Sequence, residues 1–145
     1  MKLLLLILLF VPLQTKESVT VQFSFDSFYK IDTYSRQLIT YSPDTVVSFD
    51  FSVGQKKAIL HAIDSLGVFS FPDTVRYLTR TEPKFGPYVL SVRTEDGEKS
   101  ITWYQIPDPT TPHLRQFLAF KNMIRAMVYQ SQAFRALKRP LNIIN

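Results

Sequence analysis

The sequence contains no cysteine, which excludes disulfide bonds, thiol catalysis, iron–sulfur clusters and zinc sites built on thiolates. It has only two histidines, so a metal centre built on histidine has few candidate ligands. Four glycines in 145 residues exclude collagen-like repeats, and the hydrophobic content of 46% argues against intrinsic disorder. The remaining class is a folded chain of one domain with enough apolar residues for a core.

The common catalytic signatures are also missing, among them Gly-x-Ser-x-Gly, His-Glu-x-x-His and Gly-x-x-x-x-Gly-Lys. His61 and Asp64 lie three positions apart on a predicted helix, close enough for a histidine–carboxylate pair. Four aspartates lie near predicted strands: Asp26, Asp32, Asp44 and Asp50. Nothing in the sequence singles out two of them for glycosidase chemistry. We therefore expect a non-catalytic domain without cofactor or metal, and a small carboxylate-dependent hydrolase that uses His61 and Asp64 is the alternative.

The chain begins with one lysine and an apolar run over residues 3–11. This layout is typical of a secretory signal peptide, and the run is short for a membrane span. No pair of small residues marks a cleavage site, so an uncleaved N-terminal anchor is the alternative. We expect an exported protein of the bacterial periplasm, cell envelope or medium, because small eukaryotic secreted domains usually carry disulfides. Residues 1–13 are then the signal or anchor, and residues 14–145 form a single domain.

Apolar and polar residues alternate in three segments of the N-terminal half. The first covers residues 19–25 and can be followed to 31, the second covers 38–41, and the third covers 47–51. Alternation with a period of two predicts half-buried strands, and their spacing indicates an antiparallel meander.

A helix is predicted over residues 53–66. Ser52 and Gln55 match a capping box at its start, and Gly67 is a typical residue just past a helix end. The apolar stretch 68–71 is expected to pack the helix end onto the sheet.

Asp96-Gly97 predicts a hairpin with a two-residue type I′ turn. This register places Val92 opposite Ile101 and Leu90 opposite Trp103, with the polar residues on the other face.

Thr111 and Pro112 predict the N-cap and first residue of a second helix, which bends or breaks near residues 129–131. The fold class is α+β: an antiparallel sheet of about five strands with two main helices packed on one face.

Residues 73–87 show no clean periodicity and read as a long loop, a feature that is often functional. Arginine and aromatic residues are enriched at protein interfaces. The candidate partner contacts in this loop are Arg76, Tyr77, Arg80, Lys84 and Phe85.

The C-terminal segment carries charge of one sign, since no acidic residue follows Asp108. Its basic-face candidates are Arg115, Lys121, Arg125, Arg135, Lys138 and Arg139. Such a face could bind an anionic membrane surface or an acidic protein, whereas export argues against nucleic acid. The alternative is a solvated helix face whose charge suits a helix C-terminus.

The stretch from Ala58 to Asp73 joins a helix to a Phe-x-x-Pro-Asp segment, and residues 88–97 follow as Tyr-x-Leu-x-Val before Asp-Gly. Over residues 52–128 this order resembles small exported bacterial α+β domains, which include emfourin-like protein inhibitors of metalloproteases. The resemblance implies a binding domain with another protein as its partner, and protease inhibition as the most specific form of that function. It assigns no inhibitory residue.

Overall fold

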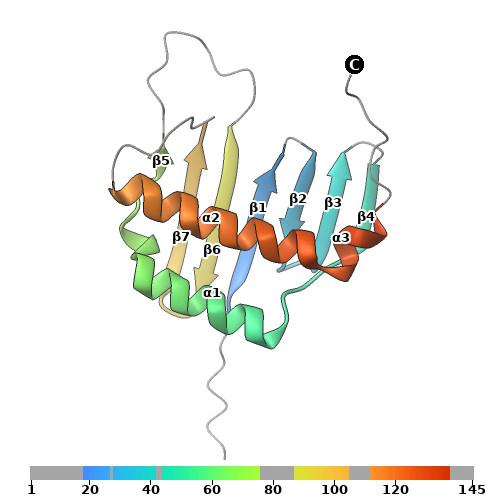
Figure 1. Ribbon diagram of the computed structural model, residues 1–145, viewed down its shortest axis with the longest axis horizontal. Coiled ribbons are helices and arrows are strands. Elements are labelled where there is room, and N and C mark those ends of the chain that lie inside the picture. The colour runs from blue at the N-terminus through green and yellow to red at the C-terminus, as the bar shows by residue number, and fades with distance from the viewer. Residues whose placement is uncertain (1–17, 27, 42–43, 76–86, 105–111, 138–145) are drawn as a thin grey trace, which may run out of the picture.

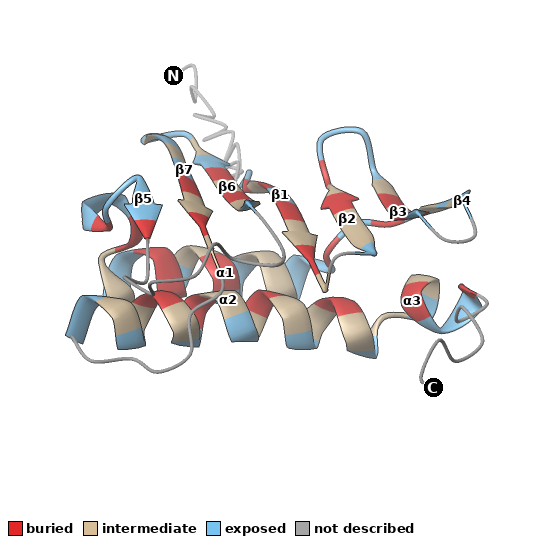
Figure 2. Ribbon diagram, turned by 90° about the horizontal axis from the view of Figure 1, so that it is seen from above, coloured by how far each residue is buried: buried red, intermediate tan, exposed pale blue. Residues whose placement is uncertain are grey.

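The fold has two layers: a seven-stranded sheet and three α-helices that lie on one side of it (Figures 1 and 2). The structure is a computed structural model that describes residues 18–26, 28–41, 44–75, 87–104 and 112–137. The strands are β1 Thr20–Phe25, β2 Tyr29–Asp32, β3 Gln37–Tyr41, β4 Asp44–Ser48, β5 Thr74–Val75, β6 Tyr88–Thr94 and β7 Gly97–Trp103. The helices are α1 Val53–Leu66, α2 Pro112–Gln130 and α3 Gln132–Ala136, with a short 3₁₀ helix, η1, at Val68–Ser70.

The order of strands in the sheet is β4-β3-β2-β1-β6-β7-β5. All neighbours are antiparallel except β5 and β7, which run parallel. The α+β class is confirmed. The expected antiparallel sheet of about five strands with two main helices agrees only roughly with the structure, because the sheet is mixed and has seven strands, and a third helix follows the second.

Two features of the chain account for the extra strands. The run predicted over residues 19–31 is interrupted at Asp26, whose φ of +50° is left-handed, so the chain reverses into β2. The start of the predicted loop 73–87 pairs with β7, since Thr102 N–H donates to the Asp73 carbonyl at 2.8 Å and Tyr104 N–H to that of Val75 at 3.2 Å. The alternation of apolar and polar residues encodes neither the left-handed turn at Asp26 nor the pairing of β5 with β7.

The third predicted strand is displaced along the chain. β4 ends at Ser48, so the predicted span 47–51 lies largely beyond it. Phe49 and Phe51 are nevertheless buried, and their rings meet edge to face at 5.1 Å between centroids. These two rings are buried by packing in the segment that follows β4. In the sequence this segment has the same alternation of apolar and polar residues as a half-buried strand, so the two cannot be distinguished.

Helix α1 follows its sequence signals. Gln55 N–H donates to Ser52 Oγ at 3.2 Å, and Ser52 N–H donates to Gln55 Oε1 at 2.9 Å, which completes the capping box. Gly67 ends the helix with φ of +64°. Val68 and Phe71, which follow, are buried as expected.

Helix α2 begins at Pro112 as predicted, whereas Thr111 lies outside the described residues. The predicted break is confirmed near Ser131, whose hydroxyl accepts from Phe134 N–H at 3.1 Å and so caps α3.

The β6–β7 hairpin has a different turn from the predicted one. Thr94 pairs with Gly97, so the loop is Glu95-Asp96, and neither residue has the positive φ of a type I′ turn. Asp96 N–H donates to Thr94 Oγ1 at 3.2 Å. The turn therefore lies one residue earlier in the sequence than the predicted Asp96-Gly97 turn. The register therefore places Leu90 opposite Ile101. This shift of two residues leaves each side chain on its predicted face.

The core lies between the sheet and the helices. Helix α2 supplies four fully buried residues: Phe117, Phe120, Ile124 and Val128. The Phe117 ring meets Trp103 of β7 at 5.4 Å and Phe71 at 6.2 Å, both edge to face. Phe117 thus connects the sheet to the chain that leaves α1.

We predict that Phe117→Ala lowers the free energy of unfolding by about 3–5 kcal/mol, because it leaves a cavity among these rings. Urea denaturation followed by circular dichroism measures the change. The control is Tyr34→Ala, since this ring is 75% exposed and its loss should cost less than about 0.5 kcal/mol. Equal losses in both variants would contradict the assigned core.

Candidate functional site

The five candidate partner contacts of the predicted loop all lie outside the described residues: Arg76, Tyr77, Arg80, Lys84 and Phe85. The same holds for Lys138 and Arg139 of the basic set and for the N-terminal segment 1–13. No helix in the described part of the chain is long and apolar enough to cross a membrane.

Arg125 forms an ion pair with the sheet side of the fold, so it does not belong to an unpaired cationic face. Its Nη2 donates to Asp26 Oδ2 at 3.0 Å, and its guanidinium lies 5.2 Å from the Tyr129 ring centroid and within 3.3 Å of the Tyr129 hydroxyl. Asp26 directly follows β1, so this ion pair joins α2 to the turn between β1 and β2. The arginine therefore contributes to the fold, and its charge is balanced.

Of the other described basic-face candidates, Lys121 lies one helical turn from Arg125, whereas Arg115 and Arg135 lie elsewhere. Arg135 Nη2 donates to the Gln130 carbonyl at 2.8 Å, where it caps the C-terminal end of α2. Arg115 is exposed near the start of α2, about 120° around the helix from Lys121. Burial lowers the pKa of the Lys121 ammonium, Arg125 lowers it further, and Asp26 partly raises it. Lys121 and Arg125 thus lie together near Asp26, whereas Arg135 contacts the end of α2 and Arg115 lies near its start.

The candidate acid–base residues are not brought together. His61 and Asp64 are both exposed on α1, and no hydrogen bond or ion pair joins them. Asp50 pairs with Lys56 at 2.7 Å, and Asp26 pairs with Arg125. No group of three potential metal ligands occurs within the described ranges.

The face of the sheet opposite the helices carries the site that sequence reasoning missed. None of the described helices covers this face, which we call the open face (Figure 2). Its central positions are polar: Thr20 and Gln22 on β1, Ser91 and Arg93 on β6, and Glu98 and Ser100 on β7. The same alternation that predicted the core face places these polar residues on the opposite face. It could therefore have indicated the candidate site.

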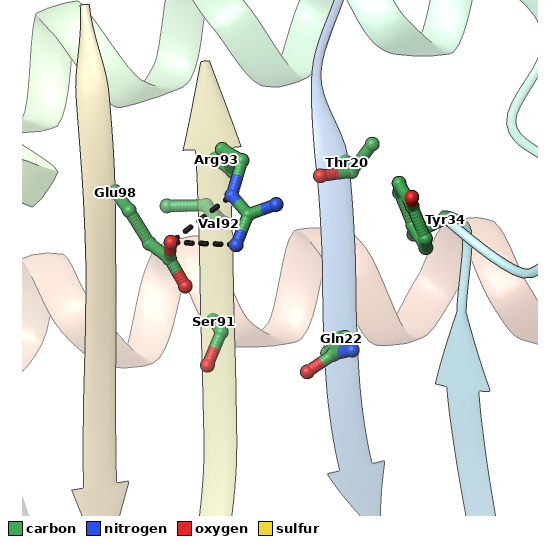
Figure 3. Close-up of a pocket in the computed structure, with 7 residues that line it drawn as sticks. All are labelled: Thr20, Gln22, Tyr34, Ser91, Val92, Arg93 and Glu98. Carbon is green, nitrogen blue, oxygen red and sulfur yellow. Dashed lines mark hydrogen bonds and ion pairs between the residues drawn. The ribbon is translucent and has the colours of Figure 1, made fainter.

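A groove of about 310 Å³ lies on the open face over β1 and β6. Thr20 and Gln22 lie between Tyr34 on one side and the Arg93–Glu98 pair on the other (Figure 3). Arg93 donates from Nε and Nη2 to Glu98 Oε2 at 3.0 and 2.8 Å. The groove therefore offers hydroxyl and amide groups, an aromatic ring and a balanced ion pair.

The loop between β2 and β3 positions Tyr34. Asp32 Oδ1 accepts from the backbone N–H groups of Tyr34 at 2.9 Å and Ser35 at 3.3 Å, and its Oδ2 accepts from Gln22 Nε2 at 3.0 Å. Arg36, with φ of +55°, completes the reversal into β3. Asp32 thus fixes the backbone of Tyr34, while the Tyr34 side chain remains 75% exposed.

No protein-family model, curated protein or solved structure matches this chain. The resemblance to emfourin-like inhibitors therefore stays a prediction from the residues.

We predict that Lys121→Met raises the free energy of unfolding at pH 7, because it removes a cation that is partly desolvated by the fold. The folded pKa lies below the usual value of 10.5, so the unfolded state binds more protons just below that pH. The wild type should therefore gain stability relative to the variant as pH rises toward 10.5.

Urea titrations of both proteins between pH 7 and pH 10.5 measure this difference. Lys57→Met, at an exposed position of α1, is the matched control. A stability gap between wild type and Lys121→Met that did not narrow with pH would refute the assignment.

Proposed function

We propose that this chain is an exported, non-catalytic binding domain that recognises a protein partner through the groove on the open face. The observation that carries the proposal is the exposed Tyr34 ring beside a polar groove, on a sheet face that none of the described helices covers. Tyrosine combines a large contact area with a hydroxyl group, and it is enriched where proteins bind one another.

The backbone around the groove is held in place before any partner arrives. β1 and β6 are paired through four residues of each strand, and Asp32 fixes the turn that carries Tyr34. Binding to ordered backbone costs less conformational entropy than binding to a segment that must become ordered. This arrangement favours recognition of a surface segment without refolding.

The charge of the groove favours a protein segment that is polar and close to neutral. Arg93 already donates twice to Glu98, so the two charges at the groove balance. Nucleic acid and anionic lipid are attracted by unpaired cations. Hydroxyl and amide groups instead suit the mixed hydrogen-bond donors and acceptors of a protein surface.

The predicted export and the resemblance to protease inhibitors support an extracellular or envelope protease as the specific partner class. The groove, and not a catalytic group, is then the part of the chain that a protease would contact. Binding to anionic membranes through α2 is less well supported, because Arg125 and Arg135 are engaged in intramolecular contacts.

A photo-crosslinking aromatic amino acid at position 34 tests this proposal in envelope and supernatant fractions of the producing cells. We expect a saturable protein adduct from position 34. The matched probe at position 61 should give none, because His61 is exposed on α1 in the helix layer. Adding Ser91→Arg to the position 34 probe should abolish the adduct, since a long side chain would fill the groove.

Once the adduct identifies the partner, Tyr34→Ala should weaken its affinity about tenfold or more. Adducts of equal yield from positions 34 and 61, or an adduct that survives Ser91→Arg, would refute the groove as the binding surface. Retention on anionic vesicles without any protein adduct would support the membrane alternative instead.

A further inference from the structure

The two edges of the sheet differ in how well they are protected. At one edge β5 is only two residues long. At the other edge β4 has five residues, each paired one to one with β3, so it contains no bulge. Short edge strands, bulges and charged side chains, lysine above all, are features that prevent edge-to-edge pairing. β4 has five residues and no bulge or lysine, and its single charged side chain, Asp44, lies at one end.

The hydrogen-bond pattern shows which groups of β4 face outward. Phe49 N–H donates to the Arg36 carbonyl at 3.0 Å, so 36 and 49 form a hydrogen-bonded pair in the β3–β4 ladder. Such pairs alternate along an antiparallel ladder, so the backbone groups of Thr45 and Val47 also point to β3. Those of Asp44, Val46 and Ser48 therefore point away from the sheet. No described residue pairs with this outer edge.

The side chains of β4 also favour pairing. Thr45, Val46 and Val47 are β-branched, which suits an extended strand. Val46 is 54% exposed and lies on the open face beside Ile39. A strand added at this edge would cover part of Val46 and satisfy the outward N–H and carbonyl groups.

We propose that β4 pairs with β4 of a second copy of this chain, in an antiparallel register centred on Val46. In that register Val46 faces Val46 of the second copy, and Asp44 faces Ser48 of the second copy at both ends. The two helix layers then lie on the same side of one continuous sheet, because the two-fold axis is perpendicular to the sheet.

The chemistry of β4 favours a second copy over an unrelated strand. Asp44, Val46 and Ser48 are evenly spaced, so this register pairs all three outward residues of each copy, whereas a shift of two residues pairs fewer. The Ser48 hydroxyl can donate to the Asp44 carboxylate of the other copy, and this contact occurs twice by symmetry. No like charges face each other, so the strand is complementary to itself.

The contact is short, so we expect a reversible dimer with a dissociation constant in the micromolar range. Sedimentation velocity of the full chain over a concentration series measures it. Ser48→Lys should tighten the dimer about 2- to 10-fold, because it adds an opposite charge facing Asp44 twice. Ser48→Asp should weaken it by a similar factor. The double variant Asp44→Lys with Ser48→Asp should restore dimerisation.

Ser65→Lys and Ser65→Asp are matched controls at an exposed position of α1, and they should leave the dissociation constant unchanged. Thermal melts followed by circular dichroism verify that every variant is folded. A monomer at every concentration would overturn the proposal, and so would a dimer indifferent to the charge at position 48.

The absence of natural cysteine allows a second, independent test. In a hydrogen-bonded antiparallel pair the two Cα atoms lie about 5.5 Å apart, a separation that a disulfide can bridge. Val46→Cys should therefore form a disulfide-linked dimer under mild oxidation. Val53→Cys, at a 72% exposed valine of α1, is the control and should react at least tenfold more slowly. Equal rates would overturn the β4 pairing.

Discussion

The packing of α2 against the sheet is the contact on which the rest of the structure depends. Phe117, Phe120, Ile124 and Val128 form one fully buried stripe along this helix, and together with α1 they cover the apolar side of the sheet. With the described helices all on that side, the side chains on the opposite side must be compatible with water. The polar groove on β1 and β6 is thus a consequence of covering seven strands on one side only.

Local sequence signals predicted those parts of the fold that are determined locally. The capping box at Ser52 and the stop at Gly67 bracket α1 as expected, because both act through neighbouring residues. Alternation also predicted correctly which hairpin residues face the core, although the register was wrong by two residues. A shift of two residues leaves every side chain on the same face of the sheet, so the alternation is insensitive to it. The position of the turn depends instead on a hydrogen bond to the Thr94 side chain. β5 was missed because its strand partner in the described part of the chain is β7, far along the sequence.

The candidate binding surface was harder to predict, because the exposure and the pairing of a side chain are tertiary properties. Tyr29 and Tyr34 are five residues apart and equally aromatic, yet Tyr29 stacks on Phe25 at 5.5 Å and Tyr34 faces solvent. The basic C-terminal segment suggested a cationic face from composition alone. Composition could not reveal that Asp26, 99 residues away in sequence, pairs with Arg125. Counting the charges of one segment therefore overestimates the number of unpaired cations on its surface when acidic partners come from distant segments.

The two proposed interaction surfaces are geometrically compatible. The groove lies over β1 and β6, whereas the outer edge belongs to β4, with β2 and β3 in between. Pairing through β4 around an axis perpendicular to the sheet would leave both grooves uncovered and on the same side. A partner with two accessible segments could then be held at both grooves, and the second contact would form at a high effective concentration. A weak contact between two β4 strands would in this way increase the avidity of the dimer for such a partner.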